Sequence, residues 1–210
     1  LKVHAGDLDA GFLALREAAD VAARQRTLTY EADLRVRLAW AAAGQWGRPD
    51  AEAWLVSDAE IALARVAGES DPRWVRLTRA RGLLEYAAGN YPESEALFRE
   101  AIGRAREVEL DVGTGDIRLD LANSMRKRQA FDEARTLYAE LIEERTQLWG
   151  PQHPYVAHVE YNLAVLEVDA GRFNDAVPLA RRASNSLRTS EAGDSMAALR
   201  ADMLLVNIAI

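Results

Sequence analysis

The feature that most constrains the fold of this chain is an internal repeat. Aligned on Gly89, Gln129 and Gly171, one pattern recurs after 40 residues and again after 42. A unit of this length indicates a repeat architecture, because one unit cannot bury its own apolar face and must stack on its neighbours. The three matching segments are RGLLEYAAGNYPESEALFREA (81–101), LANSMRKRQAFDEARTLYAEL (121–141) and LAVLEVDAGRFNDAVPLARRA (163–183).

Each segment contains two apolar helical stripes separated by a short turn, which predicts a helix hairpin. An aromatic residue stands two positions after the alignment point, a small residue follows three positions later, and a small or aliphatic residue follows after seven more. Small residues at this spacing let paired helices approach closely, while the aromatic ring fills the space at the turn. In chain order these residues are Tyr91, Ser94 and Ala101; Phe131, Ala134 and Leu141; Phe173, Ala176 and Ala183.

On these residues the sequence resembles the tetratricopeptide repeat (TPR) family, over roughly residues 71–190. The segment LWGPQHPYVA, followed by NLA, resembles the longer-period variant found in kinesin light chains and bacterial relatives. Periods of 40 and 42 fit that variant, since the standard unit has ~34 residues. The sequence departs from the family pattern at five positions, where Gln129 replaces the turn glycine, Ser94 replaces an alanine, and Thr78, Arg118 and Glu160 replace an aromatic residue.

The resemblance implies an all-α fold, a right-handed α-solenoid of antiparallel helix hairpins with about ten helices. We expect one solenoid over residues 1–210. Neither end resembles a polar cap and the chain begins with Leu1, so we expect a piece of a longer protein whose exposed ends favour self-association. The expected parts are a half repeat (1–25), a degenerate repeat with an enlarged turn at 44–50 (26–67), three repeats (71–110, 113–149, 154–190) and a half repeat (195–210).

In the first half repeat, residues 5–25 are expected to form a turn and then a second helix. Prolines at 92 and 154 are expected to begin helices, where the missing N–H group costs little. Gly150 is expected to end one. The sequence GPQHP therefore predicts a helix stop followed by a helix start, with His153 hydrogen bonding locally at the entry of the next helix.

The closest approach to a metal site is His153, His158 and Glu160. Zinc requires three or four convergent ligands, whereas these two histidines do not share a helical face and the only other histidine is His4. We expect no metal, no cofactor and no catalysis. VGTGD (112–116) lacks the Lys-Ser/Thr of a phosphate loop and is expected to be a linker, and carboxylate pairs such as Glu143-Glu144 fit a solvated helix face.

Composition narrows the functional classes further. The 210 residues are 49% hydrophobic and 28% charged, which predicts a folded soluble chain. No apolar run approaches the ~20 residues of a membrane span, and no secretory signal is present. A net charge of −7 disfavours nucleic acid as a partner. We expect a cytoplasmic protein, although a chain without cysteine tolerates any redox compartment.

The five tryptophans divide into two groups. Trp40, Trp74 and Trp149 lie in helical periods and are expected in the core. Trp46 and Trp54 flank the enlarged turn, where each is either a packing residue or an exposed aromatic that binds a partner.

The resemblance also implies a concave groove lined by the first helix of each repeat, at positions i, i+3, i+7 and i+10. Arginine donors and an asparagine there would hold an extended or helical peptide, although each residue could equally be a solvated or packing residue. Leu83, Leu119 and Tyr161 break the family's clamp for chaperone tails. The implied groove residues are Arg76, Arg79, Leu83 and Tyr86; Asp116, Leu119, Asn123 and Arg126; His158, Tyr161, Val165 and Val168; with Lys127 and Asn162 at their flanks.

Three functional hypotheses follow. The leading one is a non-catalytic scaffold that binds a protein or peptide in the groove. The alternative is a regulatory or sensor segment of a larger bacterial signalling protein, such as a Ser/Thr kinase or a transcriptional regulator. An enzyme in its own right has the least support.

Overall fold

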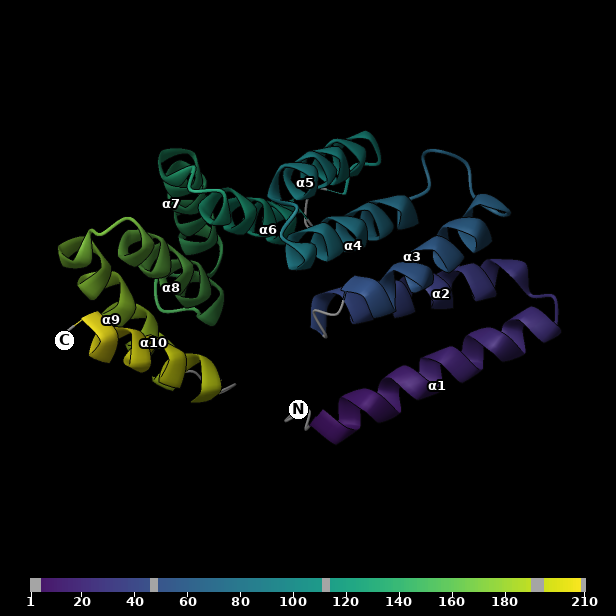
Figure 1. Ribbon diagram of the computed structural model, residues 1–210, viewed down its shortest axis with the longest axis horizontal. Helices are drawn as coiled ribbons and strands as arrows, with labels where there is room; N and C mark the ends of the chain where they lie inside the picture. The colour runs from purple at the N-terminus through teal and green to yellow at the C-terminus, as the bar shows by residue number, and fades with distance from the viewer. Residues whose placement is uncertain (1–4, 46–48, 111–113, 190–194, 209–210) are drawn as a thin grey trace. The chain divides into compact units, whose positions relative to one another are not determined.

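The computed structural model describes residues 5–45, 49–110, 114–189 and 195–208, which contain ten α-helices and no strand (Figure 1). The predicted all-α fold with about ten helices is confirmed. Within these ranges no helix is both long and apolar enough to cross a bilayer. The helices are α1 (Ala5–Arg24), α2 (Leu28–Gln45), α3 (Pro49–Ala64), α4 (Arg73–Ala88), α5 (Tyr91–Glu107), α6 (Thr114–Lys127), α7 (Phe131–Trp149), α8 (Pro154–Asp169), α9 (Phe173–Thr189) and α10 (Ser195–Ile208).

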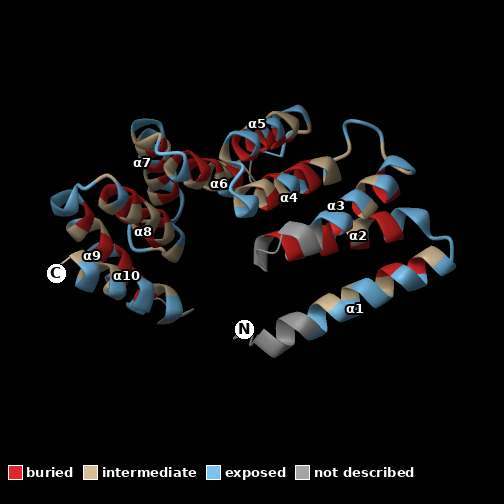
Figure 2. Ribbon diagram, viewed as in Figure 1, coloured by how far each residue is buried: buried red, intermediate tan, exposed pale blue. Residues whose placement is uncertain are grey.

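The chain divides into two compact units, Leu1–Ile117 and Arg118–Ile210. In the first unit α1 packs on α2, α2 on α3, and α4 on α5, while α2 and α3 also pack on α4. In the second unit α7 packs on α8, α8 on α9, and α9 on α10. Consecutive helices therefore form the hairpins that the repeat predicts. Buried residues run as bands along the helices, with exposed residues on the other faces (Figure 2).

The small positions of the repeat lie at the centre of these hairpins. All six are completely buried, which confirms the spacing argument: Ser94, Ala101, Ala134, Leu141, Ala176 and Ala183 are each 0% exposed. The aromatic position behaves differently. Tyr91 and Phe131 are half-buried, whereas Phe173 is 50% exposed, so the expectation that its ring fills the turn is wrong.

The three alignment points share one backbone conformation. Gly89, Gln129 and Gly171 have φ angles of 83°, 67° and 73°, in the left-handed region that favours glycine. Two backbone hydrogen bonds close each helix end: Gly89 N–H donates to the Tyr86 carbonyl and Asn90 N–H to the Glu85 carbonyl, and the same pair of bonds recurs at 129–130 and 171–172. This is the Schellman arrangement. It explains why glycine stands at two of the three points.

A close contact between the two helices of a hairpin explains another glycine. A Cβ atom on Gly82 of α4 would lie 2.6 Å from Cε1 of Phe98 in α5, and Phe98 is 0% exposed. In the next repeat the corresponding residues are Ala122 and Tyr138, both 0% exposed, and the Tyr138 hydroxyl donates to Asn123 Oδ1 at 2.7 Å. In both hairpins the first helix thus carries a small residue where the second helix presents a large ring.

Two of the positions where the family often has an aromatic residue carry ion pairs between helices. Arg118 of α6 donates to Glu140 and Glu144 of α7 at 2.9 and 2.5 Å. The nearly buried Glu160 of α8 accepts from Arg182 Nε of α9 at 2.6 Å. A buried charge is tolerated when it is paired in this way. These polar contacts therefore replace apolar packing at both positions.

A second buried carboxylate joins three elements. The side chain of Glu167 in α8 is 5% exposed and accepts from Arg135 Nε of α7 at 2.6 Å. It also accepts at 2.7 Å from Nε of Arg172, in the turn between α8 and α9. We call Arg135, Glu167 and Arg172 the Glu167 cluster.

Several local expectations are confirmed at the α7–α8 junction. Gly150 follows the last residue of α7 with φ 86°, and Pro154 begins α8. His153 precedes that helix, and its Nδ1 accepts a hydrogen bond from the Tyr155 N–H at 3.2 Å. The predicted local role of His153 is therefore correct. Pro92 likewise stands in the first turn of α5, behind Asn90.

Other local expectations are wrong. Residues 5–11 form no turn, because α1 is one helix from Ala5 to Arg24. The predicted VGTGD linker ends early, since α6 begins at Thr114; residues 111–113 lie outside the described ranges. Trp40 and Trp149 are not in the core but are 40% and 47% exposed. A helical period locates an apolar stripe but does not say which residues on it meet a neighbour.

The remaining tryptophans differ from one another. Trp74 packs against the core cluster of the first unit, as expected, and its indole N–H donates to the Gly68 carbonyl at 3.0 Å. Trp54 is 49% exposed, and the guanidinium carbon of Arg16 lies 5.7 Å from its ring centre. Trp46 lies outside the described residues.

The contact at Gly82 predicts a large effect of one methyl group. Gly82→Ala should lower the free energy of unfolding by about 1–3 kcal/mol, because Phe98 is fully buried and has no room to retreat. Gly103→Ala in α5 is the matched control. No atom lies within 4 Å of its Cβ position, so this change should raise stability by about 0.5–1 kcal/mol through helix propensity. Urea denaturation measures both; equal effects of the two substitutions would contradict the packing argument.

The left-handed backbone of Gln129 predicts that a substitution by glycine stabilises the protein. Gln129→Gly should raise the free energy of unfolding by about 1 kcal/mol, because it removes the steric cost of a left-handed non-glycine residue. The converse change, Gly171→Gln, should lower it by a similar amount. Thermal and urea unfolding of the two variants provide the comparison, and a destabilised Gln129→Gly variant would show that the Gln129 side chain makes a contact worth more than the strain.

Candidate functional site

The strongest candidate site is a cleft of about 440 Å³ in the first unit. Its polar lining comes from the first helices of two successive hairpins, α2 and α4, and Val75, Leu110 and Ile117 add apolar surface. We call it the α2–α4 cleft. Its principal side chains are Asp33, Arg37 and Trp40 of α2 and Arg73, Arg76 and Arg79 of α4.

The α2 wall follows the spacing expected of a groove helix. Tyr30, Asp33, Arg37 and Trp40 stand at i, i+3, i+7 and i+10, on one helical face. The Trp40 ring is 40% exposed, and Tyr30, on the same face but outside the cleft lining, is 58% exposed. Arg37 Nε donates to Asp33 Oδ2 at 2.7 Å. These residues were missed in the sequence because the 26–67 segment was treated as degenerate, although the same spacing would have found them.

On the α4 wall, Arg73 is held in place. Its Nε and Nη2 donate to Asp71 Oδ1 and Oδ2 at 2.9 and 2.7 Å, and its backbone N–H donates to Asp71 Oδ1 at 2.9 Å. Its Nη1 also reaches the carbonyl of Thr29, at 3.3 Å. The hydrogen bond from the Arg73 side chain lowers the pKa of Asp71 below its ordinary value of 3.8. This contact fixes one cation at the mouth of the cleft.

The two predicted residues Arg76 and Arg79 line this same cleft. Arg76 is exposed, and no hydrogen bond or ion pair to its side chain is found within the described part of the chain. Four arginines and one carboxylate, Asp33, line the cleft. Asp33 pairs with Arg37, and Asp71 pairs with Arg73, so arginines outnumber these carboxylates by two (4 − 2 = 2), which favours an anionic ligand.

The other predicted groove residues of the first unit lie outside the cleft lining. Leu83 packs against the core cluster built from α2, α3 and α4. The Tyr86 ring lies 5.8 Å from the Tyr91 ring, centre to centre. Asp116, in the first turn of α6, is exposed. The structure therefore brings together Arg76 and Arg79 but not these three.

In the second unit, the two strongest polar candidates have partners within the chain. Asn123 accepts from the buried Tyr138 hydroxyl. Arg126 forms an ion pair with Asp169, and its side chain is only 10% exposed. Leu119 is half-buried and Lys127 is exposed at the end of α6.

The candidates on α8 are only partly accessible. Tyr161 packs against a core cluster of α8, α9 and α10, and the Asn162 side chain donates to the His158 carbonyl at 2.9 Å, one turn earlier. Val165 and Val168 are half-buried. No group of three or more metal-ligating side chains occurs among the residues that the structure describes.

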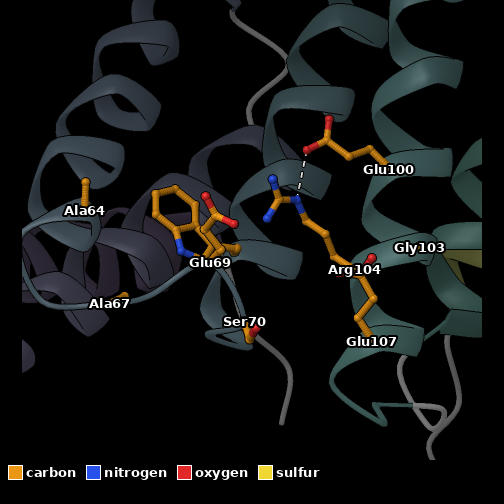
Figure 3. A pocket seen from close by; sticks show the side chains of 9 residues that line it. Ala64, Ala67, Glu69, Ser70, Glu100, Gly103, Arg104 and Glu107 are labelled. Atoms are coloured by element: carbon orange, nitrogen blue, oxygen red, sulfur yellow. Dashed lines mark hydrogen bonds and ion pairs between the residues drawn. The ribbon is translucent and has the colours of Figure 1, made fainter.

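A second cleft, of about 790 Å³, lies between the end of α3, the segment that follows it, and α5. Its charged lining comprises Glu69, Glu100, Arg104 and Glu107 (Figure 3). Arg104 Nε donates to Glu100 Oε1 at 2.9 Å. With three carboxylates and one arginine, this cleft has the opposite charge to the α2–α4 cleft, and it contains none of the predicted groove residues.

Comparison with known families agrees with the repeat geometry. Tetratricopeptide repeat models match residues 113–189 and residues 80–109. The chain belongs to the tetratricopeptide repeat family. The two matches cover the three repeats in which the small positions are buried and the turns are left-handed. No curated protein sequence matches the TPR chain at a significant level.

Solved structures show the same fold at low identity. BtubC (BKLC) from P. vanneervenii is 16% identical, with a TM-score of 0.65 over 96% of this chain and 89% of that one. A putative kinesin light chain with nearly identical TPR-like repeats, from Podosopora anserina, is 14% identical, with a TM-score of 0.63 over 89% of this chain and 90% of that one. The resemblance to the kinesin-light-chain variant of the TPR fold is therefore confirmed.

The contact between Asp71 and Arg73 predicts a pH-dependent contribution to stability. Asp71→Asn should lower the free energy of unfolding by about 1 kcal/mol at neutral pH, because the carboxylate accepts hydrogen bonds from both the guanidinium and the backbone N–H of Arg73, the first residue of α4. The pKa of Asp71 is lowered in the folded protein. The contribution is thus complete above pH 3.8 and is lost as the pH falls through the lower folded value.

Urea unfolding of the protein and of Asp71→Asn, from neutral pH down to about pH 3, measures this difference. The gap between the two curves should narrow below pH 3.8. Glu69→Gln, a nearby exposed carboxylate, is the control and should change stability little at any pH. A gap that stays constant down to the lowest pH would show that Asp71 acts without its charge.

Proposed function

We propose that this TPR protein is a non-catalytic scaffold that binds an acidic peptide or protein segment in the α2–α4 cleft. The observation that carries the proposal is the charge of the lining, four arginines against one carboxylate, beside an exposed tryptophan. TPR repeats generally mediate protein–protein interaction and are typically scaffolds without catalytic activity.

The arginine side chains of the cleft can bind carboxylate groups of the ligand at more than one point. Arg76 and Arg79 stand three residues apart on α4 and both line the cleft, so they can donate charge-assisted hydrogen bonds to neighbouring acidic side chains or to a chain terminus. Trp40 offers an apolar face at the opposite wall, where an aromatic or aliphatic side chain of the ligand can pack. The ligand is therefore an acidic segment with at least one apolar residue.

The size of the cleft limits what enters it. A volume of about 440 Å³ is within the range of sites that hold small ligands, so it holds a few side chains of a partner rather than a folded surface. An anionic nucleic acid would also be attracted by the four arginines. The net charge of −7 and the acidic second cleft oppose an extended phosphate backbone, which favours a short acidic peptide.

We place the charged contacts in the first unit rather than in the second. Asn123 and Arg126 already bond Tyr138 and Asp169, and a ligand would have to compete with these partners. For Arg76, a ligand would not have to displace a partner that the described residues supply.

The test is binding of short synthetic peptides rich in Asp and Glu that contain one aromatic residue, measured by calorimetric titration. Arg76→Ala and Arg79→Ala should each weaken binding about ten- to a hundredfold, the effect of losing a charge-assisted hydrogen bond. Trp40→Ala should weaken it as well. Binding should decline as salt is added, because exposed charges are screened.

The matched control is Arg106→Ala, an exposed arginine of α5 that does not line the α2–α4 cleft. It should leave both binding and thermal stability unchanged. A control peptide with lysine in place of every acidic residue should not bind. If acidic peptides fail to bind, or if Arg106→Ala weakens binding as much as Arg76→Ala, the α2–α4 cleft is not the site.

A further inference from the structure

We infer that the carboxylate of Asp33 is a built-in competitor of the acidic ligand in the α2–α4 cleft, and that it sets how tightly the cleft binds. This inference rests on the proposed function of the cleft. Among the described residues that line the cleft, Asp33 is the one carboxylate. It stands at the second of the four groove positions of α2. A carboxylate at this place meets the same arginines as a carboxylate of the ligand.

On its own wall, Asp33 occupies an arginine that a ligand could use. Arg37 Nε donates to Asp33 Oδ2 at 2.7 Å, and the two side chains are 55% and 30% exposed. An exposed pair one helical turn apart is weak, because water screens the charges and two side chains must be held in one geometry. A carboxylate of the ligand can therefore displace Asp33, and Arg37 is shared between an internal and an external partner.

Asp33 also faces the arginine that is fixed on the α4 wall. Arg73 Nη1 donates to the carbonyl of Thr29 at 3.3 Å, and Thr29 precedes Asp33 by one helical turn, on the same face of α2. The pKa of Arg73 is raised, chiefly by its hydrogen bond to Asp71, and the negative charge of Asp33 adds to the effect. Asp33 thus lies between arginines of both walls, in the place that suits an acidic group of the ligand.

The charge of Asp33 opposes an acidic ligand in two ways. It repels a carboxylate that enters the cleft, and it holds Arg37, so the ligand must exchange one carboxylate for another to reach that arginine. A repulsive group of this kind is a common means of limiting which ligands a site accepts. Removing the charge should release Arg37 and end the repulsion together. The affinity for acidic peptides should then rise.

The test is calorimetric titration of Asp33→Asn with the synthetic acidic peptide that contains one aromatic residue. Asparagine keeps the shape of the side chain and an oxygen that can accept from Arg37, so the variant removes little besides the charge. The peptide should bind roughly three- to tenfold more tightly than to the wild-type protein. Thermal melting should show no gain in stability, since a weak ion pair is lost. A residue that only supports the fold would not tighten binding when it is changed.

Two further variants isolate the contact. Asp20→Asn is the matched control, because Asp20 is an exposed carboxylate of α1 outside the cleft lining. It changes the net charge equally and should leave the affinity unchanged. In an Arg37→Ala background, Asp33→Asn should give a smaller gain than in the wild-type protein, because no arginine remains at that position to be released.

The outcomes separate the role of Asp33 from the proposed function. If the peptide binds the wild-type protein and binds Asp33→Asn no more tightly, the cleft remains the site and only the role of Asp33 is overturned. Equal tightening by Asp20→Asn, or an undiminished gain in the Arg37→Ala background, would overturn it as well. If the peptide binds neither the wild-type protein nor Asp33→Asn, the proposed function fails and the competitor role fails with it.

Discussion

In two hairpins of this protein, α4–α5 and α6–α7, the first helix carries a small residue where the second helix presents a buried ring. Gly82 lies against Phe98, and in the next repeat Ala122 takes the place of the glycine while a tyrosine, Tyr138, replaces the phenylalanine. Native interiors are packed without voids, so the volume on one helix fixes what the other helix can carry. The positions of α5 and α7 against the helices before them depend on this pairing of a small residue with a large ring, whereas in α8–α9 the corresponding residues are both alanines, Ala164 and Ala180.

The polar residues between helices follow from the same constraint. Where the repeat lacks an aromatic residue, Arg118 and Glu160 occupy the position and each finds an oppositely charged partner on the following helix. A buried ion pair contributes less than good apolar packing, but losing one partner is costly. Of the two, only Glu160 is buried, so its pair with Arg182 is the costlier one to break. Repeats that differ in composition can then keep one geometry.

Much of the fold was predictable from the sequence, because the signals were local. Gly89 and Gly171 marked helix ends, and even Gln129, without the glycine signal, was placed correctly by the register of its neighbours. Prolines and the segment GPQHP located a helix start and the role of His153. These features depend on a few consecutive residues, because the groups that form a helix cap or a turn all belong to neighbouring positions in the chain.

The candidate site was predictable only in part, because it depends on contacts between distant residues. The groove spacing found Arg76 and Arg79. It could not show that Arg126 pairs with Asp169, 43 residues away. Nor could it show that the Tyr138 hydroxyl donates a hydrogen bond to the Asn123 side chain. It also placed Trp40 in the core, since periodicity alone does not separate a helix face that meets a neighbour from one that meets solvent. Pairing partners and exposure emerge only from the assembled helices.

The Glu167 cluster has a consequence for how the second unit comes apart. Its carboxylate holds Arg135 from one repeat and Arg172 from the next, so opening either repeat leaves a buried negative charge with half of its partners. In repeat proteins, stability is shared between the units and the interfaces that join them. A charged junction of this kind increases the share of the stability that comes from the interface between repeats. The stretch from α7 to α9 is thereby coupled into a single cooperative segment, in which fraying at one helix spreads to the others instead of stopping at a repeat boundary.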